Sequence, residues 1–111
     1  MDPLDTWRDA LERILTEHAN IPSAHGDIKS EAVFDRQRDR YLLVDVGWKG
    51  YKRAHGAFVH VDVIDGKFWI HFDGTEVGIA NQLVEAGVPK NRIVLAFKHP
   101  TLREHTDFAI A

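Results

Sequence analysis

The sequence has no cysteine among its 111 residues and no apolar run as long as a membrane span. The first absence rules out disulfide bonds and thiol nucleophiles, and it suits a reducing cytosol. The second predicts a protein that does not cross a membrane, because a spanning helix needs roughly 18 or more apolar residues. The N-terminus is acidic, with Asp2 and Asp5, whereas a secretory signal begins with basic residues. We therefore expect a soluble, cytoplasmic protein.

An excess of positive charge is also missing. The chain has 14 Lys and Arg against 17 Asp and Glu, for a formal net charge of −3. Tight DNA binding by this chain alone is not expected, because nucleic-acid affinity comes mainly from basic side chains that neutralise phosphates. Two basic groups lie at opposite ends of a predicted strand, roughly 25 Å apart at ~3.3 Å per residue, and do not form one stripe. These groups are Arg36, Arg38 and Arg40, and Lys49, Lys52 and Arg53.

A chain of this length forms one domain, residues 1–111. Its first predicted element is a helix, with Asp2 as a good N-cap and Pro3 at the first helical position. One stripe at helical spacing is predicted to be buried. It consists of Leu4, Trp7, Leu11, Ile14, Leu15 and His18.

Four strands follow, at residues 31–35, 41–48, about 54–64 and 67–72. The second carries Leu42, Val44, Val46 and Trp48 on one face and Tyr41, Leu43 and Asp45 on the other. A basic turn at residues 49–53 separates the second strand from the third. Asp65-Gly66 is the strongest signal for a two-residue type I′ turn, which joins the last two strands.

The apolar period then changes from 2 to 3.6 residues. A helix over residues 76–86 is predicted, with Thr75 as its cap and Gly87 as its left-handed end. An apolar strand at residues 93–97 completes a strand–helix–strand crossover. Thr101 and Glu104 form a capping-box pattern for a last short helix, and the apolar tail at 108–111 is expected to dock on the core or on another subunit. We therefore expect an α+β fold: a helix, a four-stranded, mostly antiparallel meander, a helix–strand crossover and a short C-terminal helix.

The predicted turn determines which residues of the last hairpin share a face. Because side chains alternate, Val59, Val61, Val63, Phe68, Ile70 and Phe72 should face the core. The opposite face should then carry His60, Asp62, Trp69, His71 and Asp73. In this register His60 lies directly opposite His71.

This polar face has three interpretations. The two imidazoles, with Asp62 or Asp73 as a third ligand, could bind one Zn²⁺ or act in acid–base chemistry. Alternatively, the His and Asp side chains form hydrogen bonds across the strands, with Trp69 covering them. A third interpretation, which suits the position better, is a partner-binding face centred on Trp69. Candidate contact residues are Trp48, Lys49, His60, Trp69, Phe108 and Ile110.

Several segments along nearly the whole chain resemble one known family, the XisI proteins, which are controlling factors for excision of the fdxN element. The matching segments are Ile21-Pro22, Gly26-Asp27, Val33-Phe34-Asp35, Asp39 to Trp48, His55-Gly56, Asp73 to Glu76, Gly78 to Ala80, Val88 to Lys90, His99-Pro100 and Thr106 to Ala109. His71 departs from the family pattern, because relatives usually carry Gln, a poor zinc ligand, at this position.

The resemblance implies a non-catalytic factor for programmed DNA excision in cyanobacteria, with no cofactor. It implies action by protein binding, with a XisH-like protein and with a second copy of the chain, and only indirect contact with DNA. The alternative is a metal-dependent nuclease or hydrolase that uses His60, Asp62, His71 and Asp73. A third class, a direct DNA-binding control factor, predicts strongly salt-dependent binding through Lys49, Lys52 and Arg53.

Overall fold

A computed structural model describes residues 3–22 and 27–111 of the chain. Its centre is a five-stranded sheet in the order β1-β2-β3-β4-β5. The first four strands are antiparallel to their neighbours, and β5 is parallel to β4. The elements are α1 (Pro3–Ala19), β1 (Asp27–Asp35), β2 (Arg40–Lys49), β3 (Lys52–Ile64), β4 (Lys67–Asp73), α2 (Ile79–Glu85), the 3-10 turn η1 (Lys90–Arg92), β5 (Ile93–Leu95) and α3 (Pro100–Arg103). The expected α+β class is confirmed.

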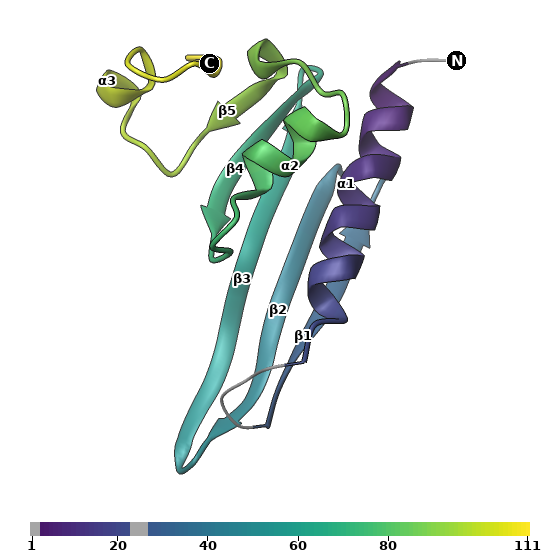
Figure 1. Cartoon of the computed structure of the whole chain (residues 1–111), viewed down its shortest axis with the longest axis vertical. Coiled ribbons are helices and arrows are strands. Elements are labelled where there is room, and N and C mark those ends of the chain that lie inside the picture. The colour runs from purple at the N-terminus through teal and green to yellow at the C-terminus, as the bar shows by residue number, and fades with distance from the viewer. Residues whose placement is uncertain (1–2, 23–26) are drawn as a thin grey trace.

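Both longer helices, α1 and α2, lie on the same face of the sheet (Figure 1). Their apolar sides and the sheet enclose one core, and burial of each large apolar side chain there contributes about 1.5–3 kcal/mol. The helices supply Leu11, Ile14, Leu15, Ile79 and Leu83, and the sheet supplies Tyr41, Leu43, Val59, Val61, Phe68 and Ile70. The core therefore fixes which face of each strand is free.

Helix α1 begins at Pro3, as its sequence predicts. The proposed cap, Asp2, lies outside the described residues. The predicted apolar stripe is buried in its middle and half-buried at Leu4, Trp7 and His18. His18 lies next to α2, where its Nε2 atom is 2.6 Å from Oε1 of Gln82. Among the described residues, no helix is long and apolar enough to cross a membrane.

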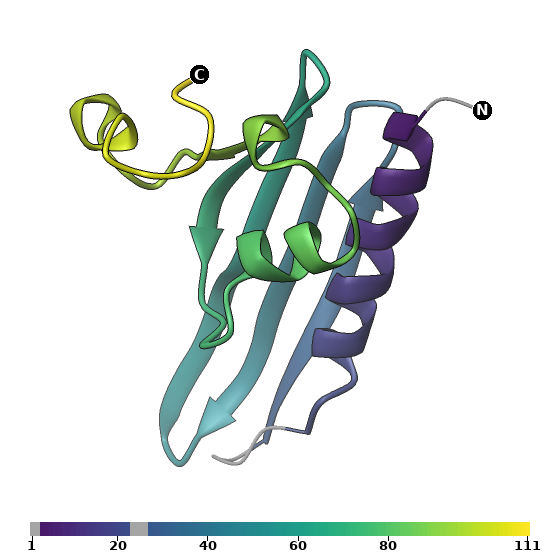
Figure 2. The same ribbon diagram turned by 45° about the horizontal axis from the view of Figure 1, so that its top comes forward.

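The first four strands are longer than predicted, whereas β5 ends at Leu95 and not at residue 97. β1 begins at Asp27 rather than residue 31. β2 ends at Lys49 and β3 begins at Lys52, so the turn between them consists of Gly50 and Tyr51 alone. Figures 1 and 2 show this hairpin extending well beyond the helices. The turn between β3 and β4 is as predicted, because Asp65 and Gly66 both have positive φ, 51° and 76°.

The β3–β4 register follows the prediction over residues 61–64 and 67–70. It then shifts by one residue, so that His60 pairs with Phe72 and not with His71. The predicted direct pairing of the two histidines is therefore wrong, because an extra residue in β4 forms a β-bulge. The same bulge disrupts the alternation, and Phe72, expected in the core, is 52% exposed.

Helix α2 begins at Ile79, three residues later than the predicted start. The residues before it form a turn held by Asp73, whose carboxylate accepts hydrogen bonds from the Thr75 N–H and hydroxyl and from the Ile79 N–H. The Thr75 hydroxyl accepts from the Gly78 N–H. Asp73 thus takes the role expected of Thr75, because its strand end brings it beside the first turn of the helix.

The last helix, α3, has a different N-cap from the predicted one. Helix α3 begins at Pro100 with His99 as its N-cap, and the His99 ring accepts a hydrogen bond from the Thr101 N–H. Thr101 itself is therefore not the cap. The tail docks on its own chain, since the Ala109 N–H donates to the Ile93 carbonyl over 2.8 Å and Phe108 packs against the core.

Candidate functional site

The sheet face opposite the helices carries an apolar patch. Tyr41 and Leu43 of β2 point into the core, so the alternating residues of this strand point to the other side. The neighbouring strands add Val33, which pairs with Leu42, and Ala57, which pairs with Val44. The resulting outer patch consists of Val33, Leu42, Val44, Val46, Trp48 and Ala57.

Charged and polar side chains border the outer patch on both sides. On β1, Glu31 pairs with Val44 and Lys29 with Val46. On β3, His55 pairs with Val46. Trp48 is 50% exposed, and the guanidinium of the neighbouring Arg53 lies 5.1 Å from the centre of its ring. An apolar centre with a polar rim is typical of protein-binding surfaces.

A second feature of this face is a cluster of His60, Asp62 and His71. His60 Nε2 lies 2.9 Å from Oδ1 of Asp62, and His71 Nε2 lies 3.0 Å from Oδ2. The two imidazole centroids are 4.8 Å apart. Arg40 also approaches, with its Nε 3.6 Å from Oδ1 of the same carboxylate. Asp62 is therefore the centre of the cluster, and the sequence did not indicate the contact with Arg40.

The predicted fourth member of this cluster, Asp73, lies elsewhere. Its carboxylate is occupied at the start of α2, where it accepts the three hydrogen bonds described above. Among the described residues, His60, Asp62 and His71 have possible metal-ligating atoms within 4.8 Å of one another. The structure thus keeps three of the four candidate ligands together.

The predicted partner contacts within the sheet lie on three strands, β2, β3 and β4. Trp48 belongs to the outer patch, and Lys49 follows it at the exposed end of β2. His60 pairs with Leu42 and so borders the patch from β3. Trp69 pairs with Asp62 and lies on the same face, with the Arg103 guanidinium 5.5 Å from its ring centre.

The two tail residues among these candidates behave differently from each other. Phe108 is half-buried and packs against the core, so its contacts are made within the chain. Ile110 remains exposed, and its carbonyl lies 3.5 Å from Nη1 of Arg103. Arg103 thereby connects the tail to Trp69.

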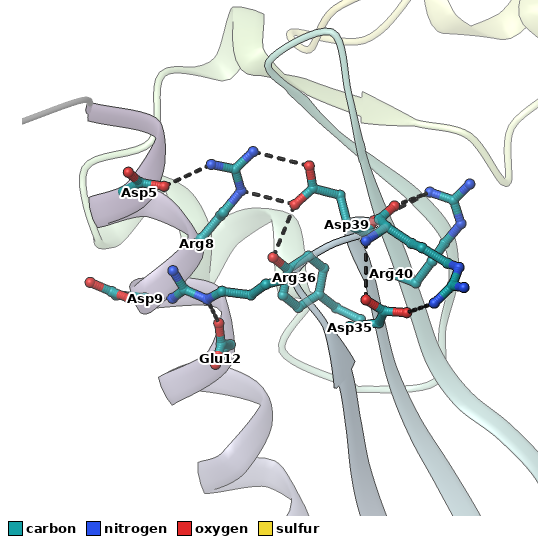
Figure 3. Close-up of polar contacts among 10 residues, drawn as sticks. Asp5, Arg8, Asp9, Glu12, Asp35, Arg36, Asp39 and Arg40 are labelled. Atoms are coloured by element: carbon teal, nitrogen blue, oxygen red, sulfur yellow. Dashed lines mark hydrogen bonds and ion pairs between the residues drawn. The ribbon is translucent and has the colours of Figure 1, made fainter.

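The basic residues near the β1–β2 turn serve contacts within the chain. Figure 3 shows Arg36 directed at Asp9 and Glu12 of α1, with which it forms ion pairs. Arg38 pairs with Asp35 over 2.8 Å. These arginines connect the turn to α1 and to β1, so they offer less positive charge to a nucleic acid than the sequence suggests.

The same region holds Tyr41 and Asp39. Asp39 accepts two hydrogen bonds from Arg8, over 2.9 and 3.0 Å (Figure 3). It also accepts one from the Tyr41 hydroxyl over 3.2 Å. Burial raises the pKa of Tyr41 to about 12, and the negative charge of Asp39 acts in the same direction. The hydrogen bond from Arg8 to Asp39 likewise raises the pKa of Arg8.

A groove of about 510 Å³ lies between the end of α1 and the β4–α2 connection. Its wall includes a hydrogen bond from the Ser30 hydroxyl to Asp45, 2.6 Å long. Sequence reasoning missed this groove, because its residues come from five separate segments of the chain. They include His18, Ile21, Ile28, Phe58, Thr75 and Val77.

The fold of this chain recurs in solved structures. The profile of the family described as "XisI protein" matches residues 1–110. A XisI-like protein from Anabaena variabilis superposes with a TM-score of 0.88 at 31% sequence identity, covering 97% of this chain and 99% of the other. The fdxN element excision controlling factor XisI from the same organism gives a TM-score of 0.84 at 33% identity, covering 99% and 100%. A comparison with curated proteins gives no match.

The chain belongs to the XisI family. The two solved structures share its fold over almost their entire length.

Proposed function

We propose that this protein is a non-catalytic controlling factor for excision of a DNA element of the fdxN type. The family match supports a role in excision control. So does the similarity, over 99% of the chain, to a protein described as the fdxN element excision controlling factor XisI. In this proposal the protein regulates an excision reaction and does not cut DNA itself.

The proposed mode of action is protein binding through the outer patch. The observation that carries it is the apolar side of β2, where Leu42, Val44, Val46 and Trp48 lie on the face opposite both longer helices (Figure 1). When a partner covers an exposed apolar area with a polar rim, the free energy falls because apolar surface is removed from water. Trp48 is the expected anchor, because tryptophan is enriched among residues that dominate binding energy.

The proposed partners are a XisH-like protein and a second copy of this chain. Both would cover apolar side chains that the helices leave free. The rim supplies specificity, because Lys29 and Glu31 on one side and Arg53 and His55 on the other must find matching groups. DNA would then be reached through the partner.

The test is co-expression of this chain with a XisH-like protein from the same organism, followed by size-exclusion chromatography with light scattering. The Val33→Glu variant places a charge in the outer patch, at a side chain that is 47% exposed. We expect it to weaken the complex at least about tenfold, because a charge would be buried without a partner.

The matched control is Val77→Glu. Val77 is 52% exposed and lies before α2, outside the outer patch. Val77→Glu makes the same chemical change as Val33→Glu, and we expect it to leave the affinity for the partner unchanged. A lack of complex with the XisH-like protein and with a second copy, or equal loss in both variants, would contradict binding through this patch.

The alternative function is a metal-dependent nuclease or hydrolase, and the cluster of His60, Asp62 and His71 is the observation that favours it. A DNA cleavage assay with added Mn²⁺ or Zn²⁺ separates the two functions. Cleavage by the unmodified protein that disappears in the His60→Gln variant would replace the accessory role with an enzymatic one.

A further inference from the structure

Two imidazoles on the outer face of the sheet share one buried carboxylate. Asp62 is 7% exposed, and each of its oxygens accepts a hydrogen bond from the Nε2–H of one histidine. A carboxylate can only accept, so both rings present Nε2 to the same small volume. We propose that His60, Asp62 and His71 form a binding site for one divalent transition-metal ion of the zinc type.

The geometry is close to what such an ion requires. Zinc binds histidine nitrogen at about 2.0–2.1 Å and carboxylate oxygen at about 2.0–2.2 Å, which places two tetrahedral donors about 3.4 Å apart. The two His–Asp donor pairs are 2.9 and 3.0 Å apart, and all three residues offer donors within 4.8 Å of one another. Shifts of about 1 Å or less in the side chains therefore admit an ion between the donors.

The backbone holds the three ligands in place. His60 and Asp62 lie two residues apart on β3, so alternation directs both side chains to the outer face. His71 is the extra residue of the bulge in β4. The bulge removes His71 from the position opposite His60 and lets its Nε2 reach the second oxygen of Asp62.

The site is accessible and has an open side. The side chains of His60 and His71 are each 36% exposed, so an ion can enter from solvent. Three protein ligands leave one tetrahedral position for water or for a group from another molecule. Arg40, 3.6 Å from Oδ1 of Asp62, balances the carboxylate charge in the metal-free protein.

The chemistry of the donors selects the ion. Two imidazoles and one carboxylate suit Zn²⁺, Co²⁺ or Ni²⁺, whereas Mg²⁺ and Ca²⁺ prefer oxygen ligands alone. The proposal concerns the isolated chain and is independent of the proposed excision role. Its test and the binding test for the outer patch can therefore fail separately.

The experiment titrates untagged protein with Zn²⁺ by calorimetry and with Co²⁺ by visible absorption. Without a tag, the seven histidines of the chain are the only imidazole ligands in the sample. We expect one ion per chain and a Co²⁺ spectrum of four- or five-coordinate type. His60→Gln and His71→Gln should each weaken binding by at least about tenfold, because even loss of an outer-shell partner costs a metal site that much.

The matched control is His55→Gln, which changes a histidine on the same strand and face that lies outside the cluster. We expect it to bind the ion as tightly as the unmodified protein, and circular dichroism of all three variants checks that they fold. Absence of one-to-one binding, or equal binding by the unmodified protein and His60→Gln, would overturn the proposal and leave a purely hydrogen-bonded cluster. Loss in His55→Gln as large as in His60→Gln would overturn it as well.

Discussion

Tyr41 is fully buried in the core but keeps a polar group at the core boundary. Its hydroxyl donates to Asp39, which in turn is held by two hydrogen bonds from Arg8. A buried phenol is stable while it is neutral, and ionisation would place two negative charges side by side. Ionisation of Tyr41 at alkaline pH therefore lowers the stability of the folded protein.

The folded protein should lose stability as pH rises from about 10 to about 12. Burial raises the folded-state pKa of Tyr41 from 10.0 to about 12. The stabilisation is therefore complete below pH 10 and disappears as the pH approaches the folded value, a loss of up to about 3 kcal/mol. Urea unfolding of the unmodified protein and of Tyr41→Phe measures this, because the variant lacks the titrating group.

A spectroscopic experiment checks the same shift directly. The chain has two tyrosines, so Tyr51→Phe leaves Tyr41 as the single one. The tyrosinate absorbance of this variant should appear near pH 12. Appearance near pH 10 in a protein that is still folded would contradict the raised pKa.

At the scale of elements, the pairing of β1 with β2 depends on a close approach of the two backbones as well as on the alternation of side chains. Gly47 of β2 pairs with Ile28 of β1. A Cβ at Gly47 would lie 1.9 Å from the Asp27 carbonyl oxygen. Position 47 must therefore be glycine for β1 to pair with β2 as far as Asp27.

Gly47→Ala should destabilise the protein by about 1–3 kcal/mol, the usual cost of overpacking. Gly56→Ala is a matched control, because the two glycines have nearly equal φ, 156° and 159°, and a Cβ at Gly56 meets nothing within 4 Å. The difference between their unfolding free energies isolates the steric contact. Equal values would show that backbone conformation, and not the approach of β1, sets the requirement for glycine.

The sequence predicted elements better than it predicted their ends and irregularities. The period-2 pattern and Asp65-Gly66 placed β3 and β4 in the correct register near their turn, since local chemistry decides it there. The bulge at His71 has no such local signal, because it arises from fitting two strands against one core. For this reason the grouping of His60 with Asp62 was predictable, while the actual roles of Asp73 and Arg40 were not.

At the scale of the whole molecule, charge is distributed unevenly. The arginines near the β1–β2 turn pair with carboxylates, whereas Lys49 and Lys52 lie at the projecting end of the β2–β3 hairpin (Figure 2). The chain also carries a net charge of −3. A long-range attraction to DNA therefore has little positive charge to support it.

The isolated protein should bind duplex DNA no more tightly than about 10⁻⁴ M at physiological salt, the weak end of non-specific binding. Fluorescence anisotropy at two salt concentrations measures this. Any residual binding at low salt should fall in the Lys49→Glu/Lys52→Glu variant. Lys90→Glu/Lys98→Glu changes the net charge equally, away from the hairpin, and should have a smaller effect. Sequence-selective binding at nanomolar concentration would contradict this expectation.

The bulge in β4 has a consequence for how the histidine cluster can change over evolutionary time. The position of His71 depends on how many residues separate it from the Asp65-Gly66 turn, and not only on its identity. Loss of one residue from β4 would restore an uninterrupted ladder and move His71 relative to Asp62 without replacing any ligand. Insertions and deletions in this strand, as well as substitutions, therefore decide which descendants of this sequence keep the cluster.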